Sequence, residues 1–405
     1  MRVCLSTFGS RGDVQPLVAL AVQLQALGAE AVVCAPHDAE FAALMARHGV
    51  TLAPAFSTVR EWVKDRLNKK IDIALAAAEV MAAQWDAILA AAEGCDLLVA
   101  TGVFSSTAAA RSVAEKLGLG YVYAAYCPFF LPSPFHRPIE YRGRPHPPGE
   151  TDNRVLWERD AESMEALFGA PFRAQRAAHG LPAVRSMRDH VYTDCPLLAA
   201  DPVLAPWRKP APLDVVQTGA WILPDTRPLP AELVAFLEAG TPPVYVGLGS
   251  MPLYTLKDIA RTTIDAIRAQ GRRVLLHRGW AELGLIDDER DCFAVDEVNQ
   301  QALFPRVAAV IHHGGAGTTT AAARAGAPQV VVPQIGDQPW WAERVAELGL
   351  GAAHAGAVSV GSLTAALDVA LAPETRARAA VTARMVRTDG ATVAAKLLLE
   401  GFDAA

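Results

Sequence analysis

The chain has 405 residues, of which 52% are hydrophobic and 20% charged, with a formal net charge of -6 at pH 7. This length predicts two domains, each with enough apolar residues for a sizeable core. The negative charge, with no basic block, argues against nucleic acid as a partner. The first apolar run stops at Gly9, too early for a signal peptide or a membrane span. We therefore expect a cytoplasmic protein without membrane insertion.

The six cysteines are scattered and form no CxxC pair. This spacing is typical of small buried side chains in a reducing compartment, and not of disulfides or a zinc site. The carboxylates do not cluster as they would around an octahedral metal ion. The sequence therefore predicts no bound metal and no other cofactor.

The first half of the chain alternates apolar strands with helices. Short apolar runs predict strands at residues 3–7, 31–35, 97–101 and 121–126. Apolar residues at helical spacing predict helices ending at Gly28 and spanning residues 73–92 and 105–117. Strands that alternate with helices indicate a parallel sheet covered on both faces, so the first half is an α/β domain.

Residues 127–150 interrupt this pattern with many prolines and with the aromatic residues Phe129, Phe130, Phe135 and Tyr141. A loop of this length in a compact domain is usually functional or mobile. The sequence leaves two interpretations open: a surface excursion with aromatic anchors, or a loop that binds substrate. Two short helical pieces, residues 158–168 and 171–179, are expected to follow.

The alternation restarts after a proline-rich segment. Strands are predicted at residues 244–247, 274–277, 293–295 and 329–332, and helices at 256–270, 339–348, 362–370, 374–387 and 392–401. We expect an N-terminal Rossmann-like domain at residues 1–208, a linker at 209–228, and a second Rossmann-like domain at 229–405 that includes the terminal helix.

A glycine-rich turn stands out in the second half, at residues 310–320 (VIHHGGAGTTT). An apolar strand ends in His312 and His313, and a helix begins among the hydroxyl residues. The free N–H groups of a helix N-terminus favour an anion, and glycines allow a phosphate to approach the backbone. Thr318 or Thr319 is suited to cap the helix. The alternative is an ordinary glycine turn with two satisfied histidines.

Several stretches together resemble the nucleotide-sugar glycosyltransferases with the GT-B fold, and most of all those that glycosylate vancomycin-type glycopeptide aglycones in actinobacteria. They keep the family's order along nearly the whole chain: GSRGDVQP at 9–16, YTD at 192–194, AADPVL at 199–204, QTGAWILPD at 217–225, RGWA at 278–281, EVN at 297–299, the glycine turn, and RAGAPQ at 324–329. Sterol glucosyltransferases share the GSRGD loop and the GDQP segment at 336–339.

The resemblance implies a role for each matching residue. Asp13 would be the catalytic base, although an acidic residue there is also suited to cap a helix. His313, Gly315, Gly317 and Thr318 would bind the diphosphate without a metal ion, helped by Ser10, Arg11 and Gly12. The nucleoside would lie near Ser250, Arg278, Trp280, Val298 and Asn299. Trp280 has the alternative role of a core anchor.

Asp337 and Gln338 match the pair that binds hydroxyls of the donor sugar, with helix capping as the alternative. The next positions, Trp340 and Trp341, depart from the family pattern, in which smaller tyrosines are usual. Together, these features predict an inverting O-glycosyltransferase that transfers a sugar from a dTDP- or UDP-sugar to a natural-product hydroxyl, with a vancomycin- or teicoplanin-type glycopeptide in antibiotic biosynthesis as the favoured acceptor.

Other functions are weighed against this one. A sterol, polyketide or flavonoid acceptor is the nearest alternative, and a sugar-nucleotide epimerase on the same fold is an alternative of another class. A dinucleotide oxidoreductase would need GxGxxG after the first strand, which is absent. A periplasmic sugar-binding protein would carry a signal peptide.

Overall fold

The computed structural model describes residues 1–55, 57–66, 72–141, 143–249, 256–279, 285, 287 and 289–401. Two of the predicted site residues, Ser250 and Trp280, lie outside these described residues. The chain forms two compact units. The first comprises Met1–Pro202, Pro206–Leu223 and Arg387–Ala405, and the second comprises Val203–Ala205 and Pro224–Val386.

The sheet of the first unit has the order β3-β2-β1-β4-β5-β6-β7, and all its pairings among the described residues are parallel. Its strands are β1 (Arg2–Phe8), β2 (Glu30–Ala35), β3 (Thr51–Pro54), β4 (Leu97–Gly102), β5 (Gly120–Ala125), β6 (Leu197–Leu198) and β7 (Val216–Gln217). The order reverses between β1 and β4. In open α/β sheets, ligands bind at the carboxyl ends of strands beside such a reversal.

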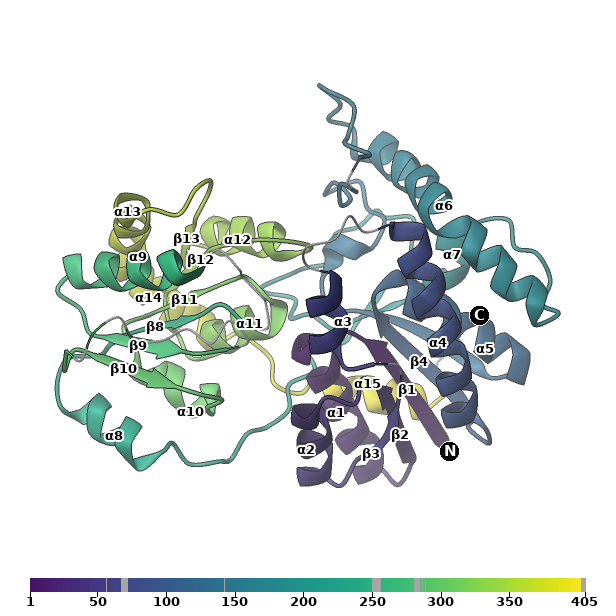
Figure 1. The fold of residues 1–405 in the computed structure, drawn as a ribbon, viewed down its shortest axis with the longest axis horizontal. Coiled ribbons are helices and arrows are strands. Elements are labelled where there is room, and N and C mark those ends of the chain that lie inside the picture. Colours follow the sequence, from purple (N-terminus) through teal and green to yellow (C-terminus); the bar gives the residue numbers. More distant parts are fainter. Residues whose placement is uncertain are drawn as a thin grey trace. The chain divides into compact units, whose positions relative to one another are not determined.

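Helices connect and cover these strands (Figure 1). They are α1 (Arg11–Ala26), α2 (Ala39–Arg47), α3 (Val59–Arg66), α4 (Ile73–Ala92), α5 (Phe104–Leu117), α6 (Asn153–Ala178), α7 (Met187–Tyr192) and the short η1 (Pro128–Phe130). By length and composition, α4 is the one described helix that could cross a membrane. Its Met81, Trp85 and Ile88 are buried, however, and it packs on α5 and α6 as a core helix does.

The terminal helix α15 (Gly390–Leu399) belongs to the first unit and packs on α1. This differs from the sequence prediction, which assigned residues up to 405 to the second domain. Two contacts account for it. Thr392 Oγ1 donates a hydrogen bond to Gln23 Oε1 at 2.8 Å, and the backbones of Gly219 and Gly390 approach so closely that neither has room for a side chain.

The second unit repeats the architecture with the order β10-β9-β8-β11-β12-β13, again parallel in every described pairing. Its strands are β8 (Val244–Gly247), β9 (Val274–His277), β10 (Cys292–Val295), β11 (Ala309–His312), β12 (Gln329–Val331) and β13 (Gly351–Ala353). Its helices are α8 (Ala231–Glu238), α9 (Leu256–Ala269), α10 (Gln300–Leu303), η2 (Phe304–Arg306), α11 (Ala316–Arg324), α12 (Gln338–Glu347), α13 (Val360–Leu371) and α14 (Pro373–Ala383).

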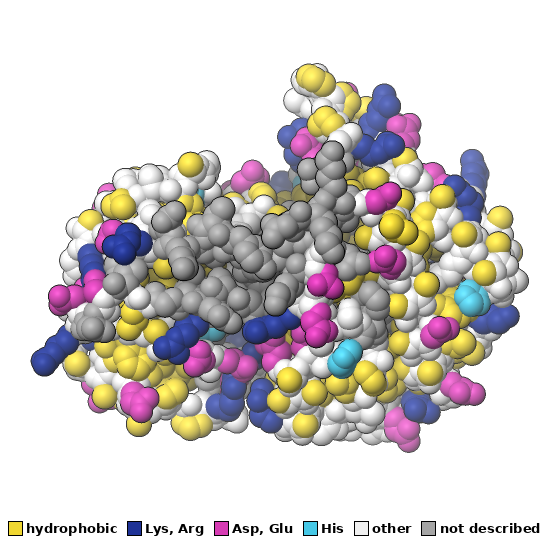
Figure 2. Space-filling view, viewed as in Figure 1, with side chains coloured by type: hydrophobic (Ala, Val, Ile, Leu, Met, Phe, Trp, Pro, Cys, Tyr) yellow, Lys and Arg dark blue, Asp and Glu magenta, His cyan; other side chains and the backbone are white. Residues whose placement is uncertain are grey.

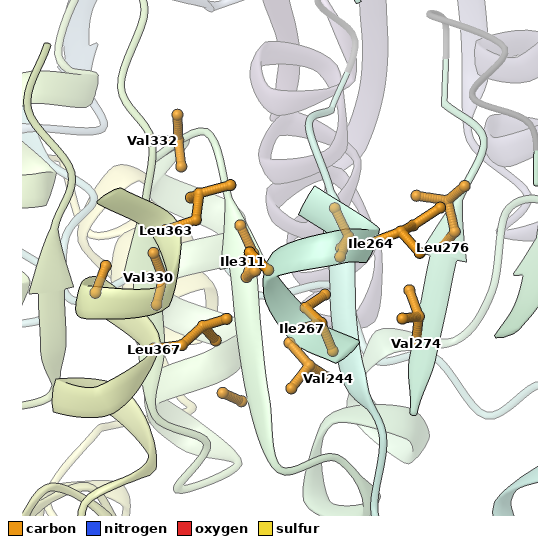
Figure 3. Packing of buried hydrophobic residues seen from close by; sticks show 14 of the residues in the cluster. Val244, Ile264, Ile267, Val274, Leu276, Ile311, Val330, Val332, Leu363 and Leu367 are labelled. Carbon is orange, nitrogen blue, oxygen red and sulfur yellow. The ribbon is translucent and has the colours of Figure 1, made fainter. Parts of the chain in front are cut away.

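Alternating residues of these strands build two cores, one on each face of the sheet. Val244 and Val246 pack with α9 and α13, where Ile264, Ile267, Leu363 and Leu367 point toward the strands (Figure 3). Tyr245, between them, points to the other face and packs with residues of α8 and α10. Because both faces are covered, the strands consist almost wholly of apolar residues, as the sequence showed.

Charged side chains of both signs are interspersed among the described residues on the face shown in Figure 2. That distribution agrees with the mixed charge of the sequence.

The fold class predicted from the sequence is confirmed. One difference concerns α6, which was expected as two pieces and is continuous through Pro171. The helix keeps its course because Leu156, Trp157, Met164 and Phe172 bury one face along its length. That packing offsets the hydrogen bond that the proline removes.

Candidate active site

In the first unit, the candidate site is the loop between β1 and α1, at the edge where the strand order reverses. Ser10 occupies the N-cap position of α1, and its side chain makes no capping hydrogen bond. Asp13 lies in the first helical turn and is half-buried. Its carboxylate folds back over Gly9, where a Cβ atom would overlap with Oδ2. The structure thus needs glycine at position 9 to keep Asp13 in this orientation.

Tyr126, which follows β5, contacts the same turn. Its hydroxyl donates a hydrogen bond to the backbone oxygen of Asp13 at 3.1 Å, and its ring meets that of Trp221 edge-on at 5.9 Å. Burial raises the pKa of the tyrosine, and the negative charge of Asp13 raises it further. Tyr126 therefore remains protonated and acts as a hydrogen-bond donor in this site. The sequence did not predict this role.

The other two predicted residues of this loop are accessible. Gly12 is exposed, and Arg11 is half-buried with its Nε atom donating to Gln15 Oε1 at 2.9 Å. Ser10, Arg11, Gly12 and Asp13 thus lie together at one helix N-terminus, a position that favours an anionic group.

In the second unit, the histidine–glycine stretch ends β11 and begins α11. His312 is fully buried. Its Nε2 lies 2.8 Å from Gln329 Oε1, and its Nδ1 accepts a hydrogen bond from the Gly314 N–H at 3.1 Å. These partners define a neutral imidazole with its proton on Nε2. Burial lowers the pKa of His312 to about 3, so this histidine serves the structure of the turn.

His313 occupies a different place, between two glycines. A Cβ atom at Gly249 would lie 2.5 Å from its Cε1, and one at Gly315 would lie 2.6 Å from its Nε2. Its Nδ1 is buried and reaches no partner in hydrogen-bonding geometry among the described residues. Burial lowers the pKa of His313 to about 4, opposed in part by the nearby backbone of Gly247. The ring is therefore neutral at pH 7.

The N-terminus of α11 follows directly. Gly315 is the N-cap residue and provides no capping side chain. Thr319 donates its hydroxyl to the Gly315 oxygen at 3.0 Å, while Gly317 is exposed and Thr318 half-buried in the first turn. The first N–H groups of a helix have no partner within it, so His313, Gly315, Gly317 and Thr318 form a site suited to a phosphate.

The start of α12 lies against this turn. A Cβ atom at Gly314 would come within 3.0 Å of the Gln338 backbone oxygen. Gln338 is buried, and its Oε1 accepts hydrogen bonds from the N–H groups of Gln334 and Ile335 at 2.8 and 3.1 Å. Asp337 is the N-cap residue but does not cap through its side chain. Its Oδ2 instead accepts a hydrogen bond from the indole of Trp341 at 3.0 Å.

The residues that were predicted to bind the nucleoside have different surroundings in the structure. Arg278 is exposed and pairs with Asp296 at 3.2 Å, while Val298 is buried. The Asn299 amide is occupied: Nδ2 donates to the oxygens of Asp225 and Arg227 at 2.9 and 2.7 Å, and Oδ1 accepts from the Ala302 N–H at 3.0 Å. Its side chain therefore fixes the chain around residues 225–227.

Three adjacent strands thus bring the second unit's site together. The turns after β8, β11 and β12 contribute Gly249, His313 and Asp337, and the strand order reverses between β8 and β11. The sequence predicted the strand at residues 244–247 but gave no sign of the contact between Gly249 and His313, since the two are far apart in the chain. Among the described residues, no three His, Cys, Asp or Glu side chains are placed to hold a metal ion.

Two parallel α/β units, each with its candidate site at the reversal of strand order, are the architecture of the GT-B glycosyltransferases. A solved structure, the glycotransferase of kitacinnamycin, has this fold with a TM-score of 0.73 and 21% identity, covering 98% of both chains. Residues 3–134 match the glycosyltransferase family 28 N-terminal domain, and residues 285–393 match the erythromycin biosynthesis protein CIII-like C-terminal domain.

Two relatives from Amycolatopsis orientalis match nearly the whole chain. Glycosyltransferase GtfE is 56% identical over 401 residues, covering 98% of this chain and 97% of its own length. Vancomycin aglycone glucosyltransferase is 53% identical over 402 residues, covering 99% and 97%. The chain belongs to this family of glycosyltransferases and is such an enzyme, which confirms the resemblance found in the sequence.

Proposed function

We propose that this enzyme transfers a sugar from a dTDP- or UDP-sugar to a hydroxyl of a vancomycin-type glycopeptide aglycone, with inversion at the anomeric carbon. The observation that carries the acceptor class is the identity of more than half of all positions to a vancomycin aglycone glucosyltransferase over nearly the full length. A biosynthetic role of this kind also fits a cytoplasmic enzyme.

The second unit supports the donor side of the proposal. The uncapped N-terminus of α11 and the neutral His313 offer N–H donors to a diphosphate. Such donors stabilise the charge that develops on the leaving group, so the residues present are suited to this task without a metal ion. Asp337 and Gln338, which lie beside this turn, would bind hydroxyls of the sugar.

The first unit supports the acceptor side. Asp13 is held over Gly9 and has a carboxylate able to accept the acceptor's proton as the C–O bond forms. The new bond forms at the anomeric carbon while the bond to the diphosphate oxygen breaks. Attack opposite to the leaving group inverts the configuration, and the carboxylate base accepts the proton that the attacking hydroxyl loses.

A matrix of donors and acceptors tests the proposal. UDP-glucose and dTDP-glucose are each supplied with a glycopeptide aglycone, a sterol and a flavonoid, and the products are analysed with and without acceptor. We expect glycosylation of the glycopeptide, and Asp13→Asn should lower its kcat by about two to four powers of ten. Preferred turnover of the sterol would contradict the acceptor assignment, and an epimerised nucleotide sugar formed without acceptor would contradict transfer itself.

The metal-free part of the proposal has its own test. Activity should survive dialysis against EDTA, and the addition of Mg²⁺ should not raise it more than a few-fold. Loss of activity on chelation, restored by Mg²⁺, would contradict diphosphate binding by backbone and imidazole alone.

A further inference from the structure

The side chains of Asp337 and Trp341 are joined across one turn of α12. The indole Nε1 donates to Asp337 Oδ2 at 3.0 Å. Residues four apart lie on the same face of a helix, one turn above the other. Trp341 is only 1% exposed and heads the fully buried side chains of the described residues by volume. Because its ring is enclosed on all sides, its N–H has a fixed direction.

The surroundings of Asp337 give this hydrogen bond particular weight. The described residues include no ion pair with Asp337, and burial raises its pKa to about 6, against which the Trp341 N–H acts. A half-buried carboxylate without a cation depends on the hydrogen bonds that it receives. The indole is the one side-chain donor that reaches it in the described part of the chain.

The neighbouring tryptophan, Trp340, provides a comparison within the same helix. Trp340 is half-buried, and its ring stands at 90° to that of Trp341 with 5.0 Å between the centroids. Among the described residues its indole makes no hydrogen bond to Asp337. The two tryptophans thus share a helix and a ring contact, but only Trp341 holds the carboxylate.

We propose that Trp341 is a positioning residue of the donor site: its N–H fixes Oδ2 of Asp337, so that Oδ1 is directed to a hydroxyl of the donor sugar. This rests on the proposed function, in which Asp337 binds that sugar. Two consequences follow. Trp341 affects the sugar part of the donor and not the nucleoside diphosphate part. Its effect also depends on the presence of Asp337.

The test compares Trp341→Phe with the matched variant Trp340→Phe. Each replacement keeps an aromatic ring and removes one indole N–H. Binding of UDP, dTDP, UDP-glucose and dTDP-glucose is measured by calorimetry. We expect Trp341→Phe to weaken binding of the nucleotide sugar about tenfold or more while leaving the affinity for the bare diphosphate within twofold. Trp340→Phe should leave both affinities within about twofold.

A double-mutant cycle shows whether Trp341 acts through Asp337. In an Asp337→Asn background, Trp341→Phe should weaken nucleotide-sugar binding much less than in the parent, because the bond that it removes no longer holds a carboxylate. An equal loss in both backgrounds would show that Trp341 only fills space, and would overturn the inference. An equal loss for the diphosphate and the nucleotide sugar would overturn it as well.

Spectroscopy of the parent enzyme keeps the inference testable if Trp341→Phe does not fold. With ¹⁵N-tryptophan labelling, one indole N–H signal should move on Asp337→Asn and on addition of UDP-glucose, and stay in place with UDP. If no signal responds to both changes, the inference fails. Failure of the parent to bind any nucleotide sugar is a separate result, which would reject the proposed function itself.

Discussion

The carboxylate of Asp13 lies against the Cα atom of Gly9, in the space that a side chain at position 9 would occupy. The contact joins the end of β1 to the first turn of α1. A base must be within hydrogen-bond reach of the proton that it removes, and a displacement of about 1 Å is enough to lower a rate about a hundredfold. In the proposed reaction, Gly9 would therefore contribute to catalysis by leaving room for the Asp13 carboxylate.

Gly9→Ala should consequently lower kcat by about ten- to a hundredfold, since the new methyl group forces the Asp13 side chain into another rotamer. Steady-state kinetics and calorimetry with UDP would measure the effect, and diphosphate affinity should change little. Gly361→Ala is the control, because a Cβ atom there meets nothing within 4 Å. A kcat for Gly9→Ala within twofold of the parent would show that the orientation of Asp13 is not critical.

His313→Ala should weaken the binding of UDP and dTDP by about 1.5–3 kcal/mol, the scale of a hydrogen bond to a charged group. Because burial lowers the pKa of His313 to about 4, the ring is already neutral well below pH 7. The contribution of His313 to diphosphate affinity should therefore stay constant between pH 6 and 8. A contribution that falls with a midpoint near pH 6.5 would instead indicate a protonated imidazole.

His312 should make the protein sensitive to acid. Its folded pKa, lowered to about 3 by burial, is below the value of about 6.5 for an unfolded histidine. The unfolded chain thus binds more protons in this interval, and the stability present above pH 6.5 is lost as the pH falls toward 3. Between pH 6.5 and 5 the loss from this residue amounts to about 2 kcal/mol at most.

Urea unfolding of His312→Gln at several pH values would measure this contribution. The variant should be less stable at pH 7 but lose less stability on acidification than the parent. Replacement of the exposed His37 by glutamine is the control and should leave the pH dependence unchanged. Equal acid sensitivity of His312→Gln and the parent would place the titration elsewhere, for example at the half-buried His136, whose pKa is also lowered to about 4.

The sequence predicted the strands and helices well where apolar periodicity decides them. The bounds of α4 (Ile73–Ala92) and β8 (Val244–Gly247) coincide with the prediction. It did not predict β13 (Gly351–Ala353) or α8 (Ala231–Glu238), because a three-residue strand and a short surface helix carry little periodicity. Tertiary pairing with β12 forms β13, and local sequence does not record it.

The candidate site, like the fold, was predictable from the sequence only in part. Its turns were predictable, since glycine clusters after apolar strands mark them, as at Gly315. The contacts within the site were not, because His313 and Gly249 follow strands that are far apart in the sequence. The pairing of Asp337 with Trp341 had a visible signal in its four-residue spacing. That spacing alone does not show that the indole is buried and directed at the carboxylate.

Asn299 was predicted to bind the nucleoside, and its geometry leads to a different expectation. Three hydrogen bonds occupy its buried amide, two of them to the chain at residues 225–227. Asn299→Ala should therefore destabilise the protein by about 2–4 kcal/mol through unsatisfied backbone groups. It should leave UDP affinity within about threefold.

Arg278→Ala, at an exposed ion pair, should do the opposite: little change in stability and weaker nucleotide binding. Calorimetry and thermal unfolding of both variants decide between the roles.

The loop at residues 127–150 is anchored on one face of α6. Asn153 Nδ2 donates to the Pro134 oxygen at 3.0 Å, and one turn further the buried Trp157 donates from Nε1 to the His136 oxygen, also at 3.0 Å. Phe135, between the two anchored residues, is 41% exposed. The anchors thus present this aromatic ring to solvent, where it is able to stack on an aromatic ring of an aglycone.

Trp157→Phe should release this part of the loop and raise the KM for a glycopeptide aglycone about three- to tenfold, while slow hydrolysis of the donor without acceptor continues unchanged. Trp207→Phe is the matched control. Both indoles meet the His136 ring edge-on, at 5.8 and 6.4 Å, but the Trp207 Nε1 makes no hydrogen bond among the described residues. If both variants raise the KM equally, packing against His136 matters and the hydrogen bond does not. If neither variant changes it, the loop does not contribute to acceptor binding, and the surface-excursion interpretation of residues 127–150 is the correct one.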